Sequence, residues 1–417
     1  MDRISSQMTS RDMQYYMRRN GVKSNETANK VAGNTRVLDP RDNPSAASHS
    51  VLLSSKIDRL QTFVENAEQM KDDIRLAENS LQQANAILHD VRRLAVTAAN
   101  GTYSESDRKI MANQLNEYLY GLIDLANTRN EDGIALFSGT RRSPDAFKTI
   151  ESTVEGSGHP VVVAVEYIGD NGGRATEISD GRFAEFGNAG DHLFWANYDR
   201  IYSPFNALGY RVLQDSAIMI DGKTIPLSAG DNIHTIINKI NQADLRVRAY
   251  FDEPGGSITL EATEPHQIWL EDAGNGTVLS DLGFIEQNQL PPYNLAGGVI
   301  RSGGSIFDEV IRLRDQLYKN NALDAGGKGL KGISVAQDNL LTKIAHIGNL
   351  EQRLDTVMSR LTLDIPQYAD MNNKQLGKTP DDLAQSIVEM QDLQNMHKAT
   401  LQTTAKVLQP TLMDFLR

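Results

Sequence analysis

Two glycine-rich loops are the segments of this sequence that most resemble ligand-binding motifs. GGKGLKG at residues 326–332 is basic, but it lacks the spacing of a phosphate-binding loop and no strand precedes it. We therefore predict a flexible connection between two helices there. GDNGGR at residues 169–174 lacks the alternating oxygen ligands and the closing glutamate of a calcium loop. A tight turn between two strands is the prediction for this second segment.

The eight histidines give no sign of a catalytic or metal centre. Those on segments with a helical pattern have no second histidine or carboxylate at ligand spacing, and we expect them to be solvated or partly packed: His49, His89, His346 and His397. The motifs HExxH and GxSxG are absent from the sequence. The chain has no cysteine, which excludes disulfides, thiol catalysis and thiolate metal ligands. The sequence therefore predicts no catalytic residue, no metal and no cofactor, and hence a protein that is not an enzyme.

Composition and charge restrict the function further. The chain has 417 residues, of which 40% are hydrophobic, so it is long enough for two or three domains with a sizeable core. Its formal net charge of −12 disfavours nucleic acid as a partner, because binding to phosphates needs a basic surface. No apolar run approaches the roughly 18–20 residues of a membrane span. The start lacks the apolar core of a secretory signal, so we expect a cytoplasmic protein or one exported by another route.

A long amphipathic helix is predicted to begin near residue 44 and to end at the Asn-Gly pair at residues 100 and 101. Asn43 is its expected cap and Pro44 its first residue. A second helix is expected after Ser104, which can form a capping box with Asp107. The apolar seam of the first helix has steps of three and four over about six heptads, and it includes the predicted core positions Ile57, Leu60, Leu81 and Leu88.

The middle of the chain, residues 145–300, has the pattern of short strands. Runs rich in β-branched and aromatic residues are separated there by Gly, Pro, Asn and Asp. One short helix is expected within this region, with Asp231 as its cap. Its apolar residues fall on one side: Ile233, Ile236, Ile237 and Ile240.

Helical periodicity returns after residue 300, and Pro366 is expected to end or kink the returning helix. A last helix is predicted from Thr379 as cap with Pro380 behind it. The two long seams on either side of the β region are expected to pair with each other. The fold class is therefore α + β, an elongated helical bundle with a β-rich insertion. The returning seam supplies the predicted core positions Leu340, Ile344, Ile347, Leu354 and Leu361.

The two ends of the chain carry thinner apolar stripes. They have too much apolar surface to leave bare and too little for a core of their own, so we expect them to be disordered in the monomer and to fold on partners. The predicted assembly residues are Ile4, Met8, Met13, Met17 and Val22 at the start, and Leu401, Leu408, Leu412, Phe415 and Leu416 at the end.

Several stretches resemble the bacterial flagellin family. VAGNTRVLDPRDNPSAASHSVLLSSKI (31–57) is similar to the loop and helix start of flagellins, and IGNLEQRLDTV (347–357) to their returning helix. The ends RISSQM and TTAKVLQPTLMDFLR look most like the hook-associated members of that family, although Asp2 interrupts the usual Met-Arg-Ile-Ser start. The segment 217–262 is similar to a strand–helix–strand module of the family.

The resemblance implies an axial protein of the bacterial flagellum, exported unfolded and assembled at the junction between hook and filament. Its implied partners are a ring of copies of itself, the other hook-associated junction protein, flagellin and an export chaperone, with no nucleic acid and no membrane insertion. Two alternatives stay open: a flagellin, or a flagellin-like protein whose insertion binds a ligand or catalyses a reaction. The expected domains are terminal assembly segments (1–43 and 376–417), a helical bundle (44–144 and 301–375) and a β-rich insertion (145–300) with a module at 213–285.

Overall fold

The structure is a computed structural model, and it describes residues 2–408 apart from 144, 188, 254, 275 and 288; the side chains of residues 2–10 and 406–408 are outside the description. The chain forms two compact units. Unit 1 contains residues 1–65 and 356–417, and unit 2 contains residues 66–355. The helical and β-rich regions follow the predicted α + β plan, whereas these unit bounds differ from the three-part division expected from the sequence, which stays a prediction.

Unit 1 is helical. It holds α1 (Asp2–Ala32), the first part of α2 (Pro44–Ala98), the last part of α9 (Leu330–Leu376) and α10 (Pro380–Leu408). One cluster of its buried core consists of Leu60, Phe63 and Leu361, with Val64, Val357, Ile365 and Tyr368 packed around them. The predicted helix starts are confirmed. Asn43 Oδ1 accepts from the Ala46 amide at 3.1 Å, and Thr379 Oγ1 accepts from the Asp382 amide at 3.3 Å.

Pro366 lies inside α9, so the prediction that the helix could end there is wrong. A proline removes one backbone donor and normally costs a helix about 3 kcal/mol or more. Here the residues on either side, Ile365 and Tyr368, pack against Leu60, Phe63 and Leu361. Tertiary packing therefore favours continuing the helix to Leu376.

The helices of unit 2 bury a continuous apolar seam. They are the remainder of α2, α3 (Glu105–Ala126), α7 (Ile306–Tyr318) and α9 up to residue 355. The capping box of Ser104 and Asp107 is present as predicted. α2 and α9 are joined here by an ion pair in which Arg75 Nε donates to Glu351 Oε1 at 2.7 Å. The seam side chains of α2 in unit 2 with 0% exposure are Ala67, Ile74, Ala77, Leu81, Ala84, Leu88, Val91, Ala95 and Ala98.

The glycine-rich segment 326–332 is helical, so the predicted flexible connection is wrong. α8 (Ala322–Asp324) runs through a π-helical turn (Ala325–Gly329) into α9. A Cβ added at Gly332 would lie 2.0 Å from Glu309 Oε2, and one at Gly329 would lie 2.8 Å from Leu313 Cδ1. Both contacted residues belong to α7. These glycines therefore allow α7 and the start of α9 to approach closely.

The β-rich part of unit 2 contains four small antiparallel sheets. Their strand orders are β1-β2, β3-β4, β10-β6-β7 and β11-β5-β9-β8. The strands are β1 (Phe147–Thr153), β2 (Pro160–Tyr167), β3 (Arg174–Ser179), β4 (Arg182–Phe186), β5 (Arg200–Tyr202), β6 (Ser216–Ile220), β7 (Lys223–Leu227), β8 (Val247–Asp252), β9 (Ser257–Ala262), β10 (Leu270–Ala273) and β11 (Ile300–Ser302). Two one-turn helices, α4 (Gly190–Leu193) and α6 (Val278–Asp281), complete the connections.

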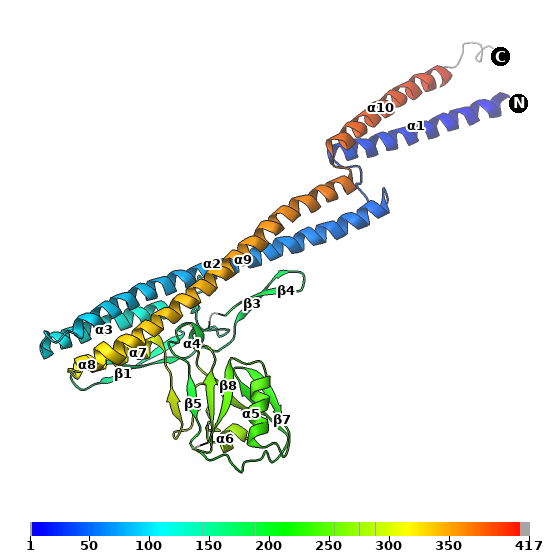
Figure 1. Cartoon of the computed structure of the whole chain (residues 1–417). Coiled ribbons are helices and arrows are strands. Elements are labelled where there is room, and N and C mark those ends of the chain that lie inside the picture. The colour runs from blue at the N-terminus through cyan, green and yellow to red at the C-terminus, as the bar shows by residue number, and fades with distance from the viewer. Residues whose placement is uncertain are drawn as a thin grey trace. The chain divides into compact units, whose positions relative to one another are not determined.

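Helix α5 (Ile233–Gln242) lies against β7 and β8 in the lower part of Figure 1 and shares one apolar core with the two larger sheets. Its four isoleucines are buried as predicted. Its cap is Asn232, whose side chain accepts from the Thr235 amide, so the expected cap at Asp231 is wrong by one residue. Asp231 instead accepts from the Ser228 amide at 2.8 Å, within the preceding turn.

The acidic loop at residues 169–174 joins β2 to β3, which belong to different sheets. The Asp170 carboxylate accepts from the amides of Thr140 at 2.7 Å and Gly172 at 3.1 Å. Its oxygens thus hold two backbone segments together.

Most of the predicted bundle positions are buried. Ile57 and Ile344 are half-buried. The buried positions are Leu60, Leu81, Leu88, Leu340, Ile347, Leu354 and Leu361. Of the helices that the structure describes, none combines the length and apolarity needed to cross a membrane.

Candidate functional site

The terminal helices α1 and α10 lie side by side in unit 1 (Figure 1). Few polar contacts join them: Asn20 Nδ2 donates to Thr400 Oγ1 at 3.3 Å. The segment after α1 is tied to the start of α10 by Arg36, whose Nη1 donates to Asp382 Oδ1 at 3.3 Å and to Gln385 Oε1 at 3.1 Å. These exposed contacts orient the pair and contribute little energy.

The pair of terminal helices has almost no core. Among the side chains described in residues 11–32 and 380–405, no hydrophobic one is buried. The two buried side chains are polar, Ser386 and Thr404. Each hydroxyl donates to a carbonyl of its own helix, that of Asp382 at 2.9 Å and that of Thr400 at 2.7 Å. The apolar contacts within the pair therefore come from half-buried side chains.

Large apolar side chains of these helices face solvent. Their exposed fractions run from 44% at Leu401 to 62% at Tyr15. Exposed apolar surface of this kind marks sites that bind other proteins. We call six of these residues the terminal apolar set: Tyr15, Tyr16, Val22, Val388, Met396 and Leu401.

The predicted assembly residues divide between described and undescribed side chains. Met13 and Met17 are half-buried, whereas Val22 and Leu401 are exposed. The others lie outside the described side chains, so their role stays a prediction: Ile4, Met8, Leu408, Leu412, Phe415 and Leu416. α1 and α10 are helices in this structure. The disorder that we expect of these ends in the isolated monomer stays a prediction.

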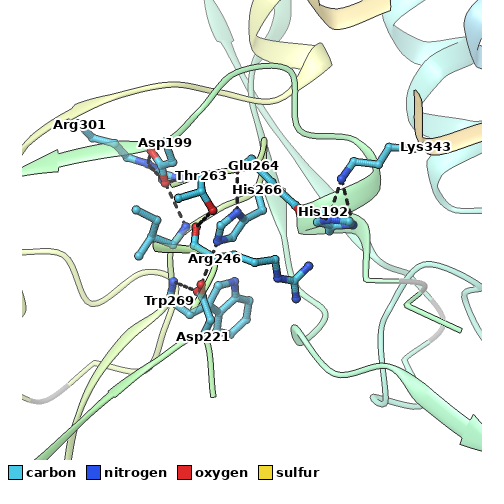
Figure 2. A network of polar contacts seen from close by, with 11 residues as sticks. His192, Asp199, Asp221, Arg246, Thr263, Glu264, His266, Trp269, Arg301 and Lys343 are labelled. Atoms are coloured by element: carbon cyan, nitrogen blue, oxygen red, sulfur yellow. Dashed lines mark hydrogen bonds and ion pairs between the residues drawn. The ribbon is translucent and has the colours of Figure 1, made fainter. Parts of the chain in front are cut away.

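A second candidate site is a cavity of about 720 Å³ in unit 2. Its walls come from the segment around α4 that follows β4, from residues 263–266 between β9 and β10, and from residues 339–350 of α9. Figure 2 shows the polar side chains gathered on these walls. Because these segments are far apart in the sequence, no local spacing of residues predicts that the side chains lie together.

His192 and Lys343 form the contact between α4 and α9. Lys343 Nζ lies 2.7 Å from His192 Nε2, and Glu264 Oε2 lies 3.4 Å from the same nitrogen. Burial and the positive charge of Lys343 lower the pKa of His192 to about 2. The imidazole is thus neutral and accepts from the ammonium. Burial also lowers the pKa of Lys343 to about 8, so this lysine titrates close to neutrality.

His266 is paired with Asp221 beside this contact. His266 Nε2 lies 2.9 Å from Asp221 Oδ2, and Nδ1 lies 2.9 Å from the carbonyl oxygen of Glu264. Burial alone would lower the pKa of His266, but the hydrogen bond to Asp221 and the charge of that carboxylate raise it above its usual value. Both ring nitrogens therefore face acceptors, which favours the imidazolium. Asp221 Oδ1 also accepts from the Trp269 amide at 3.0 Å.

Asp191 is the one carboxyl group of the cavity that is almost fully buried without a partner on one oxygen. Its exposed fraction is 3%, and Oδ1 makes no hydrogen bond with any residue that the structure describes. Burial, reinforced by the charge of Asp221, raises the pKa of Asp191 to about 7. His266, the Trp269 indole and Arg246 oppose this shift only in part.

Sequence reasoning missed this cluster. Of the histidines considered there, only His346 lines the cavity, while His192 and His266 were not singled out. Within the described part of the chain, no group of three or more His, Asp or Glu side chains is arranged to hold a metal ion. The lining of the cavity therefore combines charged side chains of both signs with apolar residues.

Comparison with known proteins identifies two segments. The bacterial flagellin N-terminal helical region matches residues 4–142, which include α1, α2 and α3. The flagellin hook IN motif matches residues 217–264, from β6 to just beyond β9. These two segments are similar to the corresponding segments of flagellins. The resemblance inferred from the sequence is confirmed.

Individual relatives are distant. Flagellar hook-associated protein 3 of Escherichia coli is 24% identical over 44% of this chain and 56% of its own length. Polar flagellin C of Vibrio parahaemolyticus is 20% identical over 86% of this chain and 88% of its own length. The crystal structure of hook-associated protein 3 from Legionella pneumophila covers 78% of this chain and 98% of its own length, at 18% identity and a TM-score of 0.45. The chain spans about half the length of the first curated relatives that it matches.

Proposed function

We propose that this chain is a structural subunit of the bacterial flagellum that assembles at the junction between hook and filament. The flagellin segment at residues 4–142 and the hook IN motif at 217–264 support a place in the flagellum. The relatives named flagellar hook-associated protein 3 in Escherichia coli and Salmonella support the junction over the filament. No catalytic role is part of this proposal.

The observation that carries the proposal is the absence of buried hydrophobic side chains in the described parts of α1 and α10. Ordering each residue costs about 1–2 kcal/mol, and α1 and α10 contain 31 and 29 residues. Fully burying one large apolar side chain returns about 1.5–3 kcal/mol. The half-buried seam between the two helices recovers only part of that energy. Burial of the terminal apolar set against neighbouring subunits supplies the rest.

The proposed partners follow from the same surface. Neighbouring copies of this chain in a ring would cover the terminal apolar set from the side. The other hook-associated junction protein and flagellin would contact the ring on its two faces. An export chaperone would cover the same apolar residues before assembly, which explains how such a surface stays soluble in the cell.

A double substitution in the terminal apolar set tests the proposal. Val22→Asp with Leu401→Asp places charges on both exposed helix surfaces, which are 52% and 44% exposed. In a strain that lacks the natural gene, electron microscopy should show hooks without filaments when this variant is the only copy. The matched control is Leu213→Asp, at an 88% exposed position of the β-rich region, which should restore filaments. Normal filaments with the double variant would refute the proposal.

A second candidate function is that of the filament subunit, favoured by the alignment with polar flagellin C over most of both chains. The two functions differ in copy number. A junction protein is a trace component of isolated filaments, whereas a filament subunit is their main component. Quantitative mass spectrometry of sheared filaments therefore distinguishes the two.

A further inference from the structure

The cavity of about 720 Å³ in unit 2 is not explained by assembly, because the terminal helices take no part in it. Its volume lies in the range of small-molecule sites, about 300–1,000 Å³. We propose that it binds a sugar acid, a small polyhydroxylated ligand with one carboxylate. This function goes beyond the proposed structural role and does not depend on it.

Arg246 is the first group that points to an anionic ligand. Its side chain is exposed and lines the cavity, and its guanidinium makes no hydrogen bond or ion pair with any residue that the structure describes. Its charge reaches His192, His266 and Lys343, since it lowers the pKa of all three. In Figure 2 the guanidinium extends away from the His266–Asp221 pair. A guanidinium without a partner is suited to bind a carboxylate with two parallel hydrogen bonds.

Lys343 supplies a second donor from another element of the lining. Its ammonium is hydrogen-bonded to the neutral imidazole of His192 rather than to a carboxylate, so most of its charge is available to a ligand. Arg246 precedes β8 and Lys343 lies on α9, so the two cations come from separate elements that both line the cavity. Together they can hold one carboxylate between them.

Asp191 adds a buried carboxyl group to the lining of the cavity. A buried oxygen without a hydrogen bond is costly, commonly by 1–3 kcal/mol, and native proteins rarely keep one without a reason. Oδ1 of Asp191 makes no hydrogen bond of normal geometry with a described residue, and the Trp269 indole N–H, which also lacks such a bond, interacts with this carboxyl group; the Asp191 side chain lines the cavity. A ligand hydroxyl would satisfy Oδ1. Burial raises the pKa of Asp191, so the group can also donate a proton in a hydrogen bond when it is protonated.

The mixture of charges selects a sugar acid over other anions. Glu185 and Glu264 also line the cavity, and their carboxylates would repel a doubly charged phosphate. The same carboxylates accept hydrogen bonds from hydroxyls. Asn171, Asn339 and Thr342 add further donors and acceptors, more than a single ammonium group of an amino acid would need. Several hydroxyls around one carboxylate match this arrangement.

Apolar side chains on the lining fit the carbon face of a sugar ring. Tyr198 is 51% exposed and lines the cavity together with Pro265 and Ile347. An aromatic ring that presents its face to a cavity is a favourable surface for the C–H groups of a pyranose. The pocket thus offers an apolar face, acceptors for hydroxyls and two cations for a carboxylate.

Isothermal titration calorimetry of the full chain at pH 7 tests the proposal with D-glucuronate as the probe. We expect saturable binding, with D-glucose, inorganic phosphate and L-glutamate each weaker by about tenfold or more. Arg246→Gln should weaken glucuronate binding by about tenfold, because a charge-assisted pair of hydrogen bonds is lost. The matched control is Arg248→Gln, two residues along, where the side chain is exposed and does not line the cavity; its affinity should stay within about twofold.

Four outcomes would overturn the proposal. Absence of saturable heat with glucuronate would exclude the ligand class. Equal binding of phosphate would indicate a general anion site, and tighter binding of glutamate an amino-acid site. Unchanged glucuronate affinity in Arg246→Gln, with circular dichroism showing a folded protein, would place any binding elsewhere. None of these results bears on filament assembly, so the junction function is tested separately.

Discussion

The helices of unit 2 and the terminal helices of unit 1 are both long and amphipathic, but they differ in how far their apolar side chains are exposed. Leu81, Leu88 and Leu354 in unit 2 have 0% exposure. Val22 on α1 and Leu401 on α10 are 52% and 44% exposed, and no hydrophobic side chain described on either terminal helix is buried. The first set stabilises a single chain. The second set is available to other chains.

Under the proposed function, one sequence encodes both a stable monomer and a surface for neighbouring subunits. On α2 the buried seam residues recur every three or four positions from Ile74 to Ala98, so this helix buries a full apolar stripe. On α10 the buried positions of the stripe are occupied by Ser386 and Thr404. Polar residues at those places limit how much the terminal pair gains from its own packing and leave the larger apolar side chains for neighbours.

The largest expected effect that sharpens this comparison comes from charge insertion. Leu354→Asp puts a carboxylate into a fully buried position of α9, and we expect a loss of about 3–5 kcal/mol in the free energy of unfolding of the monomer. Leu401→Asp, at an exposed position of α10, should change that energy by less than about 0.5 kcal/mol. Urea titrations followed by circular dichroism measure both. Equal losses would remove the distinction between the two regions.

The second expected effect concerns Asp191, a carboxyl group of unit 2 that lines the cavity and is only 3% exposed. Its folded pKa of about 7 lies above the usual value of 3.8, so the protein favours the protonated acid. The resulting stability is present below about pH 4 and is lost as the pH rises through 7. Asp191→Asn removes the titration. Since one pKa unit corresponds to about 1.4 kcal/mol, we expect the variant to be more stable than the wild type by roughly 2–4 kcal/mol at pH 8.

Melting curves of both proteins between pH 4 and pH 8 check this expectation. Asp221, His266 and Arg246 face Asp191 and are unchanged in the variant, so the difference between the two curves isolates the substituted group. The difference in melting temperature between the two proteins should increase from pH 4 to pH 7. A constant difference would show that Asp191 does not titrate in that range.

Local periodicity made the helical part of this fold predictable. The seam at Leu81 and Leu88, the capping box at Ser104 and the start of α10 after Thr379 all depend on residues a few positions apart. The predicted helix end at Pro366 and the predicted flexible connection that includes Gly332 are wrong for the opposite reason. Their local preferences favour a break, but packing against Leu60 and Phe63 in one case, and against Glu309 in the other, keeps the chain helical.

The central cavity could not be predicted from the sequence. His192, His266 and Lys343 come from three segments separated by about 75 residues each. Their juxtaposition depends on how the β-rich region packs against α9 within unit 2. No spacing rule covers such a distance, so only a three-dimensional structure could bring these residues together.

A third expected effect tests how tightly α7 and α9 pack. Gly332→Ala would place a Cβ 2.0 Å from Glu309 Oε2. Glu309 cannot move freely, because it is buried and accepts from Asn197 at 2.7 Å and from Arg312 at 3.0 Å. We expect a loss of about 1–3 kcal/mol in the free energy of unfolding. Gly327→Ala is the control, since no atom lies within 4 Å of its added Cβ, and it should be neutral or slightly stabilising. An unchanged free energy of unfolding in Gly332→Ala would mean that α7 shifts to make room for the added methyl group.

The smallest expected effect is also the most direct test of whether the terminal helices are part of the monomer's cooperative fold. Gly21 on α1 and Gly348 on α9 both lie inside helices with no atom within 4 Å of an added Cβ. Alanine at either position raises the intrinsic helix stability by about 0.5–1 kcal/mol. Gly348→Ala should raise the free energy of unfolding by that amount. Gly21→Ala should leave it unchanged, because α1 has no buried apolar side chain among its described residues to couple it to the rest. Hydrogen exchange of the α1 amides in the same variant should still slow slightly. If both substitutions stabilise the monomer equally, α1 belongs to the cooperative core, and its exposed apolar residues are then no evidence that it needs neighbouring subunits.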